Sequence, residues 1–93
     1  MWRVEFASQA ARVLRKLRGM ERQRLIEAID AIQAEPRPAG KHVKALEGAA
    51  EPLLRYRVGE RRIVYAVNDA KSVIVIRGIV ARKDLDTWLR GNQ

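Results

Sequence analysis

The stretch Leu53–Val67, LLRYRVGERRIVYAV, contains two alternating patterns that are separated by the dipeptide Gly59–Glu60. A period of two residues is typical of a strand with one buried face and one polar face. A two-residue connection that contains glycine predicts that the two strands pair as an antiparallel hairpin. We therefore expect three arginines to lie close together on the polar face of this hairpin, namely Arg55, Arg57 and Arg62.

The size and composition of the chain predict one folded domain. It has 93 residues, of which 47% are hydrophobic and 32% are charged. This length allows a single hydrophobic core, so we expect one domain that spans residues 1–93. The apolar content is too high for a disordered chain of this charge. The formal net charge of +8 favours an anionic partner, with nucleic acid, the ribosome or an acidic protein as the first candidates.

Several classes of site are disfavoured by the residues that the sequence lacks. There is no cysteine and only one histidine, so we expect no disulfide, no metal and no cofactor. No apolar run approaches the roughly 20 residues that a transmembrane helix needs. The N-terminal residues do not read as a charged segment leading into an apolar signal core. We therefore expect a cytoplasmic protein without a membrane partner.

The N-terminal third predicts a strand followed by a helical hairpin. Residues 2–6 alternate between apolar and polar side chains, which indicates a short strand. Ser8 is a candidate N-cap, because its hydroxyl can accept a hydrogen bond from a free amide of the first helical turn. One amphipathic helical pattern precedes Gly19 and a second follows it, which predicts a helical hairpin. Their basic outer faces leave three interpretations open: a solvated surface, a nucleic-acid contact or a docking surface for an acidic partner.

The middle of the chain predicts a loop. Pro36 and Pro38 end the second helix, and we expect an irregular connection from there to about Pro52. Leu46 is expected to anchor this loop to the core. His42 is either an ordinary surface residue or a general acid or base, because imidazole exchanges protons near neutral pH.

The segment VIVIRGIV at residues 73–80 is apolar in both alternating registers except at Arg77 and Gly78. This pattern predicts an interior strand that is buried on both faces. Arg77 marks either an exit at the sheet edge or an arginine on the same face as Arg55. Gly78 permits the close approach of another group.

The C-terminal residues 81–90 predict a short strand or helix that covers one end of the sheet. The complete order is a strand, a two-helix hairpin, three antiparallel strands and this short element. We therefore predict an α+β fold in which the helices cover one face of a small twisted sheet. The other face is expected to stay available to a partner.

Three segments of this pattern carry a family resemblance: KHVKALEG at residues 41–48, RYRVGERRIVYAV at 55–67 and RGIVARKD at 77–84. The most specific part is R-x-G-x-x-R-I-V-Y, which begins at Arg57. Together they resemble the RelE/ParE superfamily of toxins from type II toxin–antitoxin pairs, on the RelE side. The resemblance implies a ribosome-dependent endoribonuclease that cuts mRNA, neutralised by a cognate, acidic antitoxin. The alternative within the superfamily is a ParE-like toxin that blocks DNA gyrase, or a decayed relative that binds without chemistry.

The resemblance also implies a site. RNA cleavage by the substrate's own 2′-hydroxyl needs stabilisation of a dianionic transition state, and planar guanidinium groups bind two phosphate oxygens at once. The resemblance places the central phosphate contact at Arg62, and the full expected catalytic set is Arg55, Arg57, Arg62 and Arg82. Further RNA contacts are expected at Lys44, Arg77, Lys83 and Trp88.

One position departs from the family pattern. Many relatives have a tyrosine four residues after the C-terminal arginine, where this chain has Asp86. Trp88 is the nearest aromatic residue and either stacks on a base or packs as an anchor, but an indole cannot transfer the proton that a phenol can. Tyr56 and Tyr65 fall on the face that we expect to point inward.

Overall fold

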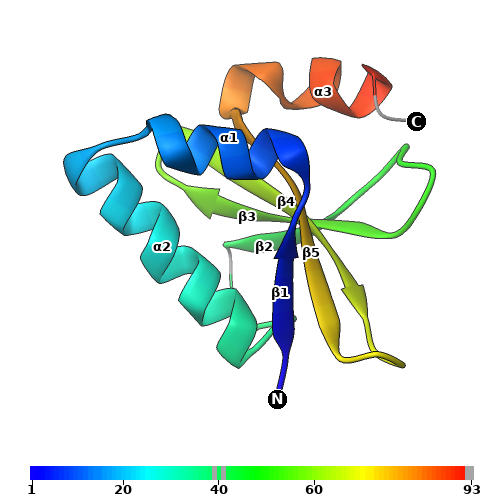
Figure 1. The fold of residues 1–93 in the computed structure, drawn as a ribbon. Helices are drawn as coiled ribbons and strands as arrows, with labels where there is room; N and C mark the ends of the chain where they lie inside the picture. Colours follow the sequence, from blue (N-terminus) through cyan, green and yellow to red (C-terminus); the bar gives the residue numbers. More distant parts are fainter. Residues whose placement is uncertain (39, 41, 92–93) are drawn as a thin grey trace.

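The computed structural model describes residues 1–38, 40 and 42–91. In this part of the chain, five strands form one sheet in the order β1-β5-β4-β3-β2, and three α-helices accompany it (Figure 1). β1 runs parallel to β5, and the other neighbours are antiparallel. This mixed sheet confirms the α+β class. The elements are β1 (Arg3–Phe6), α1 (Ser8–Lys16), α2 (Gly19–Ala34), β2 (Val43–Leu46), β3 (Leu53–Val58), β4 (Arg61–Asn68), β5 (Val73–Ala81), a 3₁₀ turn (Arg82–Asp84) and α3 (Leu85–Gly91).

The two N-terminal helices bury their apolar sides against one face of the sheet. Leu25, Ile29 and Ile32 recur at helical spacing along α2 and are buried. They share a core with Tyr65 of β4 and Ile76 of β5, both of which have no exposed surface. This packing confirms the predicted helical hairpin and the inward position of Tyr65. None of the helices in the described part has the length and apolar character that crossing a lipid bilayer requires.

The opposite face of the sheet is partly covered by α3. Leu89 of α3 is buried in a second cluster with Leu53 and Val64, and Trp88 packs at its margin. A Cβ atom built on Gly78 would lie 2.8 Å from the indole ring of Trp88, so only glycine fits there without a shift. The prediction of a covering C-terminal element is confirmed. The expectation that the whole second face stays available is wrong beneath α3.

β5 is an interior strand, as predicted, but its ladder is irregular. Val64 pairs with Gly78 while the next residue, Tyr65, pairs with Ile76, so Arg77 is an extra residue in a bulge. Bulges bend a strand and redirect the side chains beside them. The side chain of Gln9 in α1 supports the strand just beyond the bulge, because it donates to the Ile79 carbonyl at 2.9 Å and accepts from its amide at 2.8 Å.

Two local predictions are wrong. Residues 43–46, expected to be loop, form the edge strand β2, which is held by pairing with β3. Leu46 in this strand packs on the second cluster as expected. Ser8 is the first helical residue and not the cap, because the amide of Ala7 still bonds to the Ile76 carbonyl at 2.9 Å and continues the β1 ladder. Ala39 and Lys41, which fall in the expected loop, lie outside the described residues.

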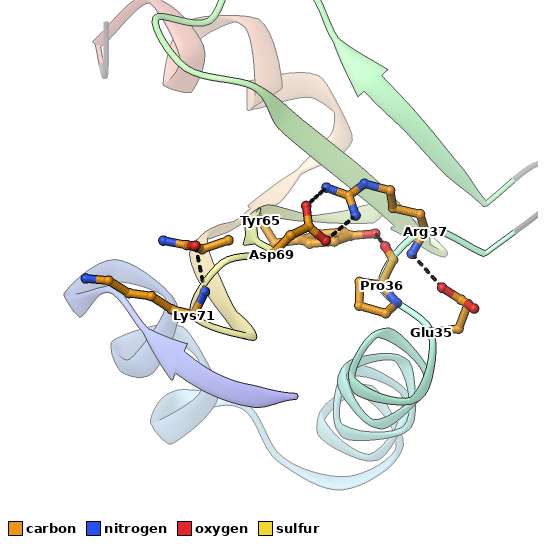
Figure 2. Close-up of polar contacts among 7 residues, drawn as sticks. Glu35, Pro36, Arg37, Tyr65, Asp69 and Lys71 are labelled. Atoms are coloured by element: carbon orange, nitrogen blue, oxygen red, sulfur yellow. Dashed lines mark hydrogen bonds and ion pairs between the residues drawn. The ribbon is translucent and has the colours of Figure 1, made fainter. Parts of the chain in front are cut away.

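A polar cluster ties the α2–β2 connection to the β4–β5 turn (Figure 2). The Tyr65 hydroxyl donates to the Pro36 carbonyl at 2.7 Å, and burial raises the pKa of Tyr65 to about 12. The Arg37 guanidinium donates to both Asp69 oxygens at 3.0 and 2.9 Å, and this contact lowers the pKa of that carboxyl. The turn therefore has a fixed position relative to the end of α2.

Candidate functional site

Four arginines surround one depression of about 600 Å³ beside α3, which we call the arginine site. Two come from β3, one comes from β4 and one lies at the start of the 3₁₀ turn. The structure thus brings together all four residues of the expected catalytic set. The described residues that line the depression are Arg55, Arg57, Gly59, Glu60, Arg62, Arg82 and Leu85.

The backbone of the β3–β4 hairpin places these side chains. Arg57 lies directly across from Arg62 in the register, and alternation puts Arg55 on the same face. The two strands are joined by a two-residue turn in which Gly59 has a φ of +58°, a conformation that L residues other than glycine rarely adopt. The amide of Arg82 donates to the carbonyl of Glu60 at 2.7 Å, so the fourth arginine is tied to the same turn.

Arg62 is the most enclosed of the four, with 8% of its surface exposed. Its Nη1 donates to the carbonyls of Gly59 and Arg61, both at 2.9 Å. Burial lowers the pKa of Arg62, and repulsion from Arg55, Arg82 and Arg57 lowers it further. Within the described residues no hydrogen bond engages its Nε or Nη2, which form the edge that binds two oxygens side by side.

The positive charge of the arginine site is not neutralised by ion pairs within the described part of the chain. Arg55 donates from Nη1 to the His42 carbonyl at 3.0 Å, which fixes the side chain without cancelling its charge. The one carboxylate among the described lining residues is Glu60, which partly offsets the effect of the neighbouring cations on the pKa of Arg62. An anion is therefore the ligand that this depression favours.

The other expected RNA contacts are not among the described residues that line the arginine site. Lys44 on β2 is exposed and sits across from Arg55 in the register, on the same face. Lys83 follows Arg82 in the 3₁₀ turn and is also exposed. Arg77 and Trp88 line a separate depression, so the structure does not place them in the arginine site.

This second depression, which we call the Arg77 depression, has a volume of about 430 Å³. Here Arg77 donates from Nε and Nη2 to the two carboxylate oxygens of Glu51, at 2.8 and 3.2 Å. Its cation is therefore paired within the protein. The described lining residues are Ala7, Ala50, Glu51, Leu53, Arg77 and Trp88.

Sequence reasoning missed Glu60 and Leu85 as parts of the arginine site. A signal for Glu60 was present, since it lies in the turn between the two arginine-bearing strands. Leu85 gave no such signal, because its place depends on how the chain folds back after β5. Asp86, at the position where relatives have a tyrosine, is exposed in the first turn of α3. Tyr56 and Tyr65 pack on the helix-covered face of the sheet.

The arrangement supplies binding and charge stabilisation for a phosphate group. The lining offers guanidinium donors and, in Glu60, one carboxylate that can accept a proton. The described residues contain no group of three or more His, Cys, Asp or Glu side chains that could hold a metal ion. The four guanidinium groups are the cations that the described lining residues present to a phosphate.

Comparison with known proteins places the fold in one family of toxins. No protein-family model and no curated protein sequence matches the chain. Among solved structures, the chain is similar to the isolated E. coli RelE toxin, with 21% identity over 98% of this chain and 95% of that chain and a TM-score of 0.68. This likeness shows the RelE-like fold.

Two further structures are more similar in sequence. One is the toxin–antitoxin complex RelBE2 from Mycobacterium tuberculosis, with 26% identity over 87% of this chain and 98% of that chain and a TM-score of 0.71. The other is the archaeal RelE–RelB complex from Pyrococcus horikoshii, with 34% identity over 87% of this chain and 94% of that chain and a TM-score of 0.74. The chain therefore belongs to the RelE family of type II toxins, and the comparisons give no support to the ParE alternative.

Proposed function

We propose that this protein is a ribosome-dependent endoribonuclease that cleaves mRNA in the cytoplasm and thereby stops translation. The observation that carries the proposal is the arginine site, where four guanidinium groups line one depression and make no ion pair within the described residues. A binding surface for a neutral ligand gains nothing from four mutually repelling cations. A phosphate diester in its cleavage transition state gains from each of them.

Cleavage proceeds by attack of a 2′-hydroxyl on the neighbouring phosphorus. The P–O bond to the attacking oxygen forms, the P–O bond to the 5′-oxygen of the next nucleotide breaks, and a 2′,3′-cyclic phosphate results. The 2′-hydroxyl loses a proton and the departing 5′-oxygen gains one. Negative charge on the non-bridging oxygens rises in the transition state, so donors fixed beforehand lower the barrier.

Arg62 is suited to the central phosphate contact. Its Nη1 is held by two backbone carbonyls, which fixes the plane of the guanidinium group. Its Nε and Nη2 can then bind both non-bridging oxygens of one phosphate. Arg55, Arg57 and Arg82 surround the same volume and add positive potential.

Proton transfer is the weaker part of this site. Arginine remains protonated at neutral pH and is a poor general base. Glu60 is the one carboxylate among the described lining residues, and Asp86 replaces the tyrosine of many relatives. Positioning of the substrate therefore has to supply much of the rate enhancement. This supports a requirement for the ribosome, which would hold the mRNA with its 2′-hydroxyl in line for attack on the phosphorus.

We propose that a cognate, acidic antitoxin controls this activity. The structures from P. horikoshii and M. tuberculosis are complexes of a toxin with its antitoxin. The net charge of +8 supports an acidic partner for this chain.

The test compares wild-type protein with Arg62→Ala and Arg62→Lys, measuring growth arrest and mRNA cleavage on ribosomes. Loss of one fixed donor typically lowers the rate by about 10²-fold to 10³-fold, and we expect that loss for alanine. Lysine keeps the charge but loses the planar fork, so we expect partial activity. Arg3→Ala is the matched control, since Arg3 is an exposed arginine on β1, at the opposite edge of the sheet from β2. Wild-type cleavage by Arg62→Ala refutes the site, and arrest with intact mRNA refutes the nuclease function.

A further inference from the structure

A third hollow, which we call the His42 groove, adjoins the arginine site. Its volume is about 320 Å³, and it lies between α2 and the edge of the sheet at β3. It shares Arg57 and Gly59 with the arginine site, so the two depressions adjoin at these residues. The groove is also lined by Arg24 and Glu27 from α2, Tyr56 from β3, and His42.

The groove lies beside the end of the β2–β3 ladder. Val43, the first residue of β2, pairs with Tyr56, so Arg57 and Val58 lie beyond the last pair of the ladder. The amide of Arg57 still donates to the His42 carbonyl, while its exposed side chain borders both hollows. A polynucleotide bound at the arginine site can therefore continue past Arg57 into the groove.

The groove presents an exposed aromatic ring. His42 and Tyr56 lie with their ring centroids 5.8 Å apart and their planes within 14° of parallel. Tyr56 is packed against the main core, so it gives the histidine ring a firm backing. His42 itself is exposed, and it lies beside β3, the strand that carries Arg55 and Arg57.

The backbone of His42 is anchored to the arginine-bearing strand. Its carbonyl accepts a hydrogen bond from the Arg57 amide at 2.8 Å and another from Arg55 Nη1 at 3.0 Å. The backbone that carries the ring is therefore held in a fixed relation to two members of the arginine site. A group placed in this way is preorganised for a ligand that reaches both hollows.

We propose that the His42 groove binds the nucleobase of an RNA nucleotide that flanks the scissile phosphate, with the base stacked on the His42 ring. The proposal rests on the proposed endoribonuclease function. Every nucleobase has a π-face, so stacking supplies affinity without strict sequence preference. Arg24 and Glu27 border the same hollow and offer a donor and an acceptor to the polar edge of the base.

This placement also separates His42 from proton transfer. The described residues that line the arginine site do not include His42, and its ring stacks on Tyr56, which packs on the helix-covered face of the sheet. His42 accordingly acts as a substrate-positioning residue and not as a general acid or base.

The test compares His42→Leu with His42→Phe in single-turnover cleavage of mRNA on programmed ribosomes. Both side chains are bulky and apolar, but only phenylalanine keeps an aromatic face. We expect leucine to raise the half-saturating toxin concentration about 10-fold, and to change the maximal rate less than about 3-fold, as loss of one base stack predicts. Phenylalanine should recover at least about half of that loss on a logarithmic scale. Ala70→Leu in the exposed β4–β5 turn serves as the control for an added surface leucine.

Each outcome decides between the two proposals. Equal half-saturation for leucine and phenylalanine, or a loss confined to the maximal rate, overturns the stacking role of His42. If cleavage then still disappears in Arg62→Ala, the proposed function stands and only the groove assignment fails. Absence of cleavage by wild-type protein on ribosomes overturns the proposed function and the groove assignment together. Thermal melting of both His42 variants shows whether a change in half-saturation follows from lost folding, in which case leucine and phenylalanine fail to the same extent.

Discussion

The arginine site and the Arg77 depression both adjoin α3, and each is lined by at least one arginine from the sheet. Leu85 at the first turn of α3 lines the former, and Trp88 one turn later lines the latter. Both hollows therefore share a helix, a sheet face and a type of cation. They differ in whether a carboxylate of the protein pairs with the guanidinium group.

In the Arg77 depression, the Nε and Nη2 edge of the guanidinium group is occupied by a carboxylate of the protein itself. Arg77 uses Nε and Nη2 to hold both oxygens of Glu51. In the arginine site, Arg62 is held through Nη1 by carbonyls, and the same Nε and Nη2 edge makes no hydrogen bond within the described residues. Arg77 thus forms an ion pair within the protein, whereas Arg62 is fixed in place with its Nε and Nη2 edge unbonded among the described residues.

This difference teaches that the capacity of a hollow to bind an anion depends less on how many arginines it contains than on whether their charges are already paired. The site arginines repel one another, which is one reason why the pKa of Arg62 is lowered. Such a cluster opposes folding until an anion arrives, as is common at functional sites. Three predictions test the contrast, beginning with the largest expected effect.

Adding a carboxylate to the arginine site should make it resemble the Arg77 depression. Leu85→Glu places an anion beside the four guanidinium groups, and at an effective dielectric near 20 one such charge is worth about 2 to 3 kcal/mol. We expect mRNA cleavage on ribosomes to fall about 10²-fold relative to Leu85→Gln, which loses the same apolar contact without adding charge. Equal rates for the two variants would contradict the importance of uncompensated charge.

Removing the carboxylate from the Arg77 depression should have the opposite, smaller effect. Glu51→Gln frees the Arg77 cation, and we expect binding of a short single-stranded RNA without ribosomes to tighten about 2-fold to 5-fold at low salt. Both side chains of the pair are about 40 to 45% exposed, so unfolding free energy should change by less than about 1 kcal/mol. Filter binding at two salt concentrations measures the change. Loss of ribosomal cleavage in this variant would show that the two hollows act as one surface.

Another ion-paired arginine, Arg37, predicts a small effect of pH on stability. Its contact with Asp69 holds the carboxyl pKa below the ordinary value, so the contact stabilises the fold above about pH 4 and is lost as pH falls through the lowered pKa. The difference in unfolding free energy between wild-type and Arg37→Met should therefore stay constant from pH 7 to 5 and shrink below about pH 4. Urea unfolding across this range measures it, with Asp69→Asn as the matched variant. A difference that persists unchanged at pH 2.5 would rule out this linkage.

The sequence predicted the arginine site better than it predicted the sheet. Alternation alone put Arg55, Arg57 and Arg62 on one face, because a two-residue turn leaves little choice of register. Arg82 was placed by the family resemblance and not by any local pattern. It reaches the site because its amide bonds to the turn between the two arginine-bearing strands.

The features that sequence reasoning missed depend on distant partners. β2 is a four-residue edge strand whose ladder is supplied by β3, so its own residues carry little strand signal. The bulge at Arg77 results from how β4 and β5 adjust to each other, and it directs this arginine to Glu51. Gly78 did predict a close approach, and the group that approaches is Trp88.

The parallel pairing of β1 with β5 has a consequence for folding while the chain is being synthesised on the ribosome. Arg3 lies beside Val73, so the first strand to be synthesised has to wait for the last before it gains a neighbour. Arg82 follows β5, so a nascent chain that ends within β4 lacks both β5, which joins β1 to the rest of the sheet, and one of the four arginines. The four arginines can therefore come together only after β5 and the start of the 3₁₀ turn have been synthesised.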